Sequence, residues 1–234
     1  MRIETFSYRF ADDILLSPRF TGVRDELLSV CNNCPIPVYS GKSRKQPSKD
    51  VVQQIMNTYF RLQFTSLGWT AEPLATPINN EDALRADFRK TFGEGDDKIT
   101  LQIEVEFGNV ASSYRNYFKF QLSFSYDLTD ICVLIVPSSE LANRIDSGVA
   151  NFEKATREIP QAKLSITVPT LVVGLFDKDE DGNKLPEWDV RATGVSLDVA
   201  QNKNKSVTAA HNELVHNYIL SLIHISEPTR RTPI

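Results

Sequence analysis

Two glutamates stand two residues apart in the stretch ITLQIEVEFGN, residues 99–109. Successive side chains of a β-strand point to opposite faces, so Glu104 and Glu106 share one face and the apolar residues share the other. A strand with one polar and one apolar face is often simply half-buried, with its charges in solvent. A third acid placed beside the pair would instead favour a site for a cation.

Asp87 is the acid that a hairpin would bring to this pair. If the turn at 93–98 is centred just before Asp96, Asp87 lies opposite Glu104, with Cβ atoms about 4.5–5.5 Å apart. Carboxylates so close repel one another unless a cation or a shared proton relieves them, and a hard divalent ion such as Mg²⁺ prefers oxygen ligands. A register shifted by one residue would turn Asp87 into the core and leave Asp96 or Asp97 as the substitute ligand.

The elements that must position these acids follow from hydrophobic periodicity. Apolar residues at helical spacing predict helices, with Ser48 and Ser138 as N-caps, at 10–30 (one or two helices), 48–69, 112–128 and 138–159. Strands are predicted before the turn and at two strongly apolar runs, at 82–92, 131–137 and within 164–176. This order predicts a single α/β domain with a mixed central sheet flanked by helices.

Composition narrows the class of protein. The chain of 234 residues has a formal net charge of −4, which argues against a non-specific nucleic-acid coat protein but not against a nuclease with acids around a metal. Its three cysteines are too few for a disulfide framework, and the pair Cys31 and Cys34 lacks the second pair that a structural zinc site needs. The sequence contains no apolar run of membrane-helix length and no secretory signal, so we expect a cytoplasmic protein without a membrane partner.

The last fifteen residues, 220–234, are set apart from the domain. Residues 220–230, LSLIHISEPTR, resemble the in-frame translation of a transposase adapter used in sequencing libraries. We therefore assign residues 1–219 to the domain and expect 220–234 to be an adapter-derived tail that does not belong to the native protein.

The strand motif also carries a family resemblance. IEVEFGN resembles the active strand of the BglII- and BstYI-type restriction endonucleases, which belong to the PD-(D/E)xK nuclease superfamily. Short motifs elsewhere resemble this family in the same order along residues 1–176: FADDILL at 10–16, LGW at 67–69, ADF at 86–88, SSELANRIDSGVANFEKA at 138–155 and VPTLVVGLF at 168–176. The resemblance implies a restriction-endonuclease-like core.

The resemblance also implies roles for the acids. Asp87 and Glu104 match the acids that bind Mg²⁺ in the family. Glu106 matches a position that holds glutamine in the BglII and BstYI enzymes, lysine in many superfamily members and glutamate in BamHI, so its role as general base stays open. Glu72 matches a further active-site position, although it could equally be a loop acid before Pro73.

Candidate DNA contacts are one residue from the same resemblance and four basic residues farther along the chain. Asn109 matches a polar residue that lies close to bases, but it could equally cap the helix that follows. Arg144, Lys154, Arg157 and Lys163 are candidate base or phosphate contacts, and we expect at least half of them to be solvated helix charges.

The activity implied is that of a type II restriction endonuclease. Such an enzyme would use Mg²⁺ to hydrolyse phosphodiesters of double-stranded DNA at a short palindrome, with GATC at its centre, and would act as a homodimer. Two alternatives remain open at this point. One is a repair or mobile-element nuclease on the same core, and the other is a sequence-specific DNA-binding relative that does not cleave.

Overall fold

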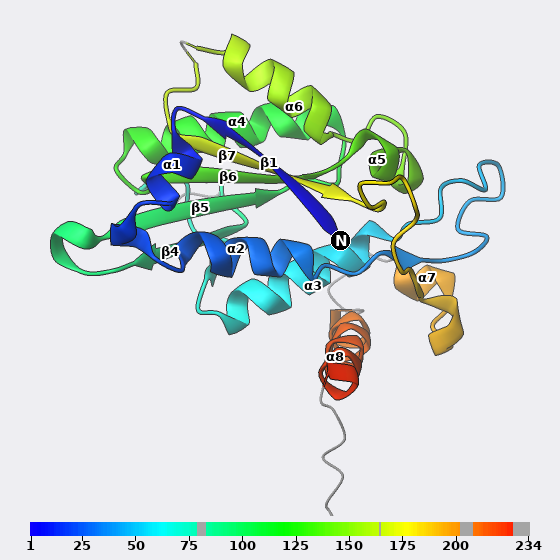
Figure 1. The fold of residues 1–234 in the computed structure, drawn as a ribbon. Coiled ribbons are helices and arrows are strands. Elements are labelled where there is room, and N and C mark those ends of the chain that lie inside the picture. Colours follow the sequence, from blue (N-terminus) through cyan, green and yellow to red (C-terminus); the bar gives the residue numbers. More distant parts are fainter. Residues whose placement is uncertain (79–82, 164, 202–207, 227–234) are drawn as a thin grey trace, which may run out of the picture.

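The computed structural model describes residues 1–78, 83–163, 165–201 and 208–226, and its centre is a six-stranded mixed sheet in the order β1-β7-β6-β5-β4-β3 (Figure 1). β5, β6 and β7 run parallel, whereas β1 and the β3–β4 pair join antiparallel at the two sides. The strands of this sheet are β1 (Arg2–Tyr8), β3 (Thr70–Ala71), β4 (Phe88–Phe92), β5 (Ile99–Val105), β6 (Ile131–Pro137) and β7 (Thr170–Phe176). A separate parallel pair is formed by β2 (Pro37–Val38) and β8 (Trp188–Asp189).

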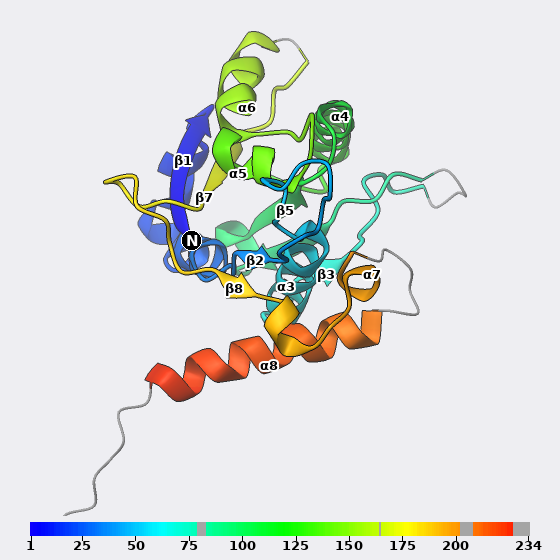
Figure 2. The same cartoon turned by 90° about the vertical axis from the view of Figure 1, so that its right-hand side faces the viewer.

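Helices cover both faces of the sheet. Their bounds are α1 (Ala11–Leu15), α2 (Val23–Asn32), α3 (Gln53–Ser66), α4 (Val110–Ser125), α5 (Ser139–Ile145), α6 (Phe152–Glu158), α7 (Leu197–Ala200) and α8 (Thr208–Ser226). Helices α2 and α3 pack on one face around a core that includes Leu101 and Ile103, and α4 and α6 pack on the other face around Leu134 (Figure 1). Helix α8 lies outside α3, on its side away from the sheet (Figure 2).

The hairpin between β4 and β5 has the predicted register. Phe88 pairs with Ile103 and Phe92 pairs with Ile99, so the continuation of the ladder sets Asp87 opposite Glu104. The alternative register, which would have made Asp96 or Asp97 the substitute ligand, is therefore not the one that forms.

Other predicted boundaries were wrong, although the fold class was right. The segment predicted as one helix at 138–159 forms two helices, α5 and α6, because residues 148–150 pair with the loop after β5 instead of continuing the helix. Helix α3 begins at Gln53, after an N-cap at Val52 rather than Ser48, and the strand predicted at 82–92 begins only at Phe88. The N-terminal strand β1 was not predicted.

Two further expectations concern membrane-spanning helices and the tail at residues 220–234. Within the described ranges, the helices are all too short or too polar to cross a membrane. Helix α8 runs through the expected boundary between residues 219 and 220, and residues 227–234 lie outside the described part of the chain. The assignment of 220–234 as an adapter-derived tail stays a prediction.

Candidate active site

The polar face of β5 is buried rather than solvated. Gln102 and Glu104 have no exposed surface and Thr100 is 8% exposed, because α4 packs across this face. An ordinary half-buried strand would leave these side chains in water. A polar face under a helix must instead find partners inside the protein, and those partners define the site.

Asp87 lies at the bend that leads into β4 and reaches across to the end of β5. Its Oδ2 accepts a 2.7 Å hydrogen bond from the backbone N–H of Val105, and its own carbonyl accepts one from the N–H of Glu72 at 3.0 Å. These two bonds fix the carboxylate at the edge of the sheet, beside the C-terminal end of the active strand.

Glu104 is fully buried and only half satisfied. Its Oε2 forms an ion pair with Nζ of Lys119 on α4, while its Oε1 has no hydrogen-bond partner. Lys119 is 7% exposed and also donates to the carbonyl of Arg85 at 3.2 Å. A buried carboxylate oxygen without a partner is rare in folded proteins and requires an explanation.

Glu106 follows the end of β5 and both of its oxygens are engaged. Oε1 accepts the N–H of Gly108 at 2.6 Å, and Oε2 accepts from Nδ2 of Asn116 on α4 at 3.0 Å. A Cβ atom at position 108 would lie 2.7 Å from Glu106 Oε1, so a side chain there would push this carboxylate aside. Glu106 is thus held in one orientation by a tight backbone turn and one helical side chain.

A small cleft opens beside Asp87. It has a volume of about 210 Å³ and is lined by residues in or next to β3, β4, β5 and α3, namely Asn57, Phe60, Arg61, Ala71, Glu72, Asp87, Phe88 and Val105. Glu72 is exposed at its edge and adopts a left-handed backbone conformation with φ 52°, which is uncommon for a residue other than glycine. Arg61 is held by a hydrogen bond to Asn212 of α8.

Burial and mutual repulsion set the electrostatics of the three acids. Burial raises the pKa of Glu104 from its ordinary 4.5 to about 8; the charge of Asp87 adds to the rise, and Lys119 opposes it. Burial likewise raises the pKa of Asp87, against the hydrogen bond from Val105, and that of Glu106, against the hydrogen bond from Gly108. All three carboxyl groups therefore hold their protons more tightly than in water when no metal ion is bound.

The acids of this site can hold a cation that needs few protein ligands. Across the residues that the structure describes, no three His, Cys, Asp or Glu side chains gather as a ready metal-binding group. Asp87 and Glu104 together can supply two carboxylates, of which Glu104 Oε1 is free of other bonds. Mg²⁺ is commonly bound through one or two carboxylates, with water and substrate phosphate completing its octahedron.

Asn109 is exposed and caps α4. Its Oδ1 accepts the N–H of Ala111 at 2.9 Å, so the capping alternative is realised in the protein alone. The amide nitrogen of Asn109 is not used by this cap and could still donate to a base.

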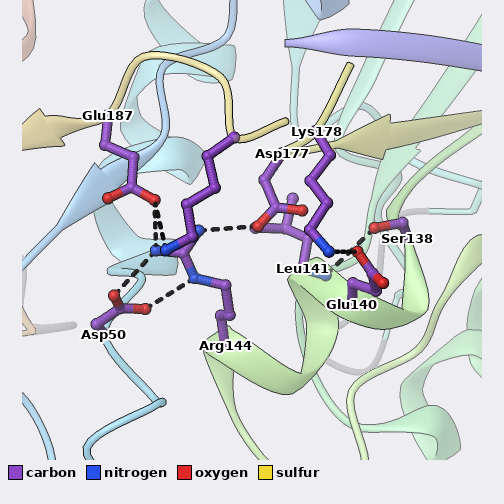
Figure 3. Close-up of polar contacts among 9 residues, drawn as sticks. Asp50, Ser138, Glu140, Leu141, Arg144, Asp177, Lys178 and Glu187 are labelled. Atoms are coloured by element: carbon purple, nitrogen blue, oxygen red, sulfur yellow. Dashed lines mark hydrogen bonds and ion pairs between the residues drawn. The ribbon is translucent and has the colours of Figure 1, made fainter. Parts of the chain in front are cut away.

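Arg144 is the centre of an ion-pair network rather than a free cation (Figure 3). Its guanidinium contacts Asp50 at 2.9 Å, Asp177 at 2.8 Å and Glu187 at 2.8 Å, and its side chain is 13% exposed. The network ties α5 to the segment before α3 and to the chain after β7. A DNA contact by Arg144 would have to displace these carboxylates.

The other three basic candidates lie on or just after α6. Lys154 forms an i,i+4 ion pair of 3.5 Å with Glu158, while Arg157 and Lys163 are exposed. Their positions are compatible with solvated charges and with phosphate contacts.

Sequence reasoning missed the polar side of α4. Asn116, Lys119 and Ser123 recur at helical spacing between aromatic residues, and they contact Glu106, Glu104 and Arg89, respectively. Among the aromatic residues of this helix, Tyr117 and Phe120 belong to the core. The polar residues at positions 116, 119 and 123 were the signal in the sequence that this helix packs against a polar face of the sheet.

Comparisons with known proteins agree with this arrangement. The family model described as "Restriction endonuclease BglII/BglIII" matches residues 3–175. The crystal structure of restriction endonuclease BglII complexed with a DNA 16-mer is similar, with a TM-score of 0.60 at 18% identity, over 77% of this chain and 80% of that chain. This likeness confirms the predicted fold: a mixed central sheet with flanking helices, as in BglII.

A curated relative matches over a shorter length. The type II restriction enzyme BamHI of Bacillus amyloliquefaciens is 26% identical over 100 residues, which is 43% of this chain and 45% of BamHI. The chain thus aligns with less than half of the length of that relative. The family model covers far more of the chain, and on that match the protein belongs to the BglII/BglIII family of restriction endonucleases.

Proposed function

We propose that this protein is a type II restriction endonuclease that hydrolyses double-stranded DNA with Mg²⁺ at a short palindromic site, with GATC-centred sites as the first to test. The observation that carries the proposal is the unpartnered Oε1 of Glu104, a buried carboxylate oxygen close to Asp87. The energetic cost of such an atom is offset if a cation binds to it during function.

Asp87 and Glu104 are the residues that would hold the metal. When bound, Mg²⁺ polarises a phosphate oxygen and lowers the pKa of a nearby water. Asp87 is oriented for this role by the N–H of Val105, and Glu104 by the ammonium of Lys119. Three acids facing a polyanion would repel it, so DNA binding at this site is coupled to the binding of the cation.

Glu106 and Glu72 serve the attacking water in this proposal. Glu106 accepts hydrogen bonds from Gly108 and Asn116 but retains lone pairs that can orient the water or accept its proton. Attack in line with the leaving group forms a new P–O bond as the bond to the 3′ oxygen breaks. Glu72, at the edge of the cleft, is proposed to contact the same water.

DNA contacts are proposed for a polar group and for the basic residues. The amide of Asn109 lies at the start of α4, three residues beyond Glu106, and is proposed to reach a base edge. Arg157 and Lys163 are exposed and proposed as phosphate contacts, with Lys154 beside them. Arg144 contributes only if DNA displaces its carboxylate partners.

We also propose that the active unit is a homodimer, because a palindrome presents the same half-site twice. Helix α4 offers a surface for a two-fold contact: Tyr114 and Phe118 are 53% and 59% exposed, one turn apart. Large aromatic side chains left in water are typical of protein interfaces. A partner on α4 would also fix the helix that supplies Asn116 and Lys119 to the site.

The test is digestion of unmethylated phage DNA by the purified protein, with Mg²⁺ and in parallel with EDTA. The proposal predicts discrete fragments with Mg²⁺ only, and sequencing of their ends gives the recognition site and the cut position.

The other outcomes discriminate the alternatives. A smear without fixed ends would indicate a repair or mobile-element nuclease. Intact DNA that is nonetheless bound by the folded protein would indicate a relative that recognises DNA without cleaving it, and would refute the proposed activity.

A further inference from the structure

Lys119 is a buried cation that the sequence motifs of the site did not include. Its ammonium, on α4, ion-pairs with Glu104 and donates to the carbonyl of Arg85 at 3.2 Å. Its side chain is 9% exposed and that of Glu104 is 1% exposed, so this is an ion pair inside the protein. Burying an unpaired charge is costly, and the two charges depend on each other.

The surroundings of Lys119 are strongly acidic. Its charge acts on Asp87 and Glu106 as well as on Glu104, and lowers the pKa of all three carboxyl groups against the effect of burial. The next cation, Arg89 on β4, is engaged with Gln102 at 2.7 Å and with Ser123 at 3.2 Å. Within the described part of the chain, Lys119 is thus the cation that ion-pairs with this group of acids, through Glu104.

The ion pair engages Glu104 on one side only. Lys119 binds Oε2 and leaves Oε1 without a partner. The bond to the carbonyl of Arg85 holds the ammonium from a second direction, on the side of Oε2. The geometry therefore presents a defined oxygen for a second cation.

We propose that Lys119 is a positioning residue with two linked roles. Its ammonium is the internal counter-ion of ionised Glu104 while the protein is free of metal. It also holds Glu104 by Oε2 so that Oε1 is presented to the divalent cation. The second role rests on the metal site of the proposed function, whereas the first does not.

The two roles predict a specific link between Lys119 and metal. Without the lysine, buried Glu104 would have no counter-ion until a divalent ion binds. A cation that binds the folded state alone stabilises it by mass action. Removal of Lys119 should therefore make the stability of the fold depend on metal much more than in the wild type.

The experiment is thermal unfolding in mildly alkaline buffer, with EDTA and with Mg²⁺, for the wild type, Lys119→Met and Lys119→Met/Glu104→Gln. Lys184→Met is the matched control, because Lys184 is exposed and its surface ion pair with Glu187 is long, at 3.9 Å. We expect Lys119→Met to lower Tm in EDTA by roughly 5–15 °C and Mg²⁺ to restore most of that loss. The double variant should recover stability in EDTA and lose the response to Mg²⁺, and Lys184→Met should match the wild type throughout.

Three results would overturn the inference, and they differ from a failure of the proposed function. If Mg²⁺ raised the Tm of the wild type and of Lys119→Met equally, Lys119 would not be linked to metal binding. A double variant as unstable as Lys119→Met would show that the lysine acts through packing alone. Loss of stability in Lys119→Met without any response to Mg²⁺, in either protein, would keep the counter-ion role but overturn the presentation of Oε1, together with the proposed metal site.

Discussion

The orientation of the Glu106 carboxylate depends on the absence of a side chain at Gly108. Because a Cβ at position 108 would lie 2.7 Å from Glu106 Oε1, Gly108→Ala must push the carboxylate or the turn aside. We expect this substitution to reduce DNA cleavage strongly while it lowers the free energy of unfolding by only about 1–3 kcal/mol, as for overpacking elsewhere. Cleavage rates and thermal unfolding measure the two effects separately.

A double-mutant cycle identifies the cause. In a Glu106→Ala background the carboxylate is absent, so Gly108→Ala should reduce cleavage no further. An additional loss in that background would mean that Gly108 acts on something other than Glu106.

The pH dependence of metal binding follows from Glu104. Its pKa is raised to about 8, so below this pH the folded protein without metal holds a proton that the cation must displace. Affinity for Mg²⁺ should therefore rise as pH increases from 6 toward 8, by up to about tenfold per unit, and level off above. Calorimetric titration over this range measures it, and an affinity that is constant between pH 6 and 8 would contradict the role of Glu104.

At the scale of single residues, local sequence predicted part of the site. The turn at 93–98 and the alternation of β5 were enough to align Asp87 with Glu104, because hairpin register depends on nearby residues. Lys119 could not be found in this way: its partner is 15 residues distant, and the contact exists only once α4 has packed on the sheet.

Among the elements, the connection between α5 and α6 shows what periodicity cannot reveal. Residues 138–159 carry helical spacing throughout, yet α5 ends at Ile145, Asp146 is extended and Gly148 then adopts φ +72°. Val110 donates to the carbonyl of Gly148, and Ala150 donates to that of Gly108. The break is therefore imposed by a pairing with the loop after β5, the same loop that holds Glu106.

The Arg144 network fastens the last turn of α5, just before this break (Figure 3). Arg144→Met would leave Asp177, whose side chain is 3% exposed, without its cation, and we expect a loss of about 3–5 kcal/mol in the free energy of unfolding. Chemical denaturation measures it, with Arg157→Met as the exposed control that should change little. Unchanged stability of Arg144→Met together with weakened DNA binding would instead favour a direct DNA contact.

At the scale of the whole molecule, the exposed aromatics of α4 test the assembly. Phe118→Glu should leave the fold intact, since the side chain is 59% exposed, but weaken a dimer roughly 30-fold or more. Sedimentation velocity over a concentration series measures this. Phe10→Glu is the matched control, because Phe10 is 76% exposed and lies outside α4. A dimer unchanged by Phe118→Glu would place the interface elsewhere.

Helix α8, which lies beyond the residues matched by the family model, contacts a residue that lines the cleft. The match ends at residue 175, yet Asn212 of α8 holds Arg61, which lines the cleft beside Asp87. Nothing in the strand motifs pointed to α8, because it packs on the side of α3 that faces away from the sheet (Figure 2).

The central claim is that Asp87 and Glu104 support Mg²⁺-dependent cleavage of DNA. The most direct test is the single-turnover cleavage rate, with Mg²⁺, of the wild type, Asp87→Asn and the matched control Asp96→Asn, which changes an exposed acid in the same hairpin. We expect Asp87→Asn to lower the rate by about 10²–10³-fold or more while the protein still folds and binds DNA, and Asp96→Asn to cleave like the wild type. Equal rates for wild type and Asp87→Asn, or a loss confined to Asp96→Asn, would contradict the account.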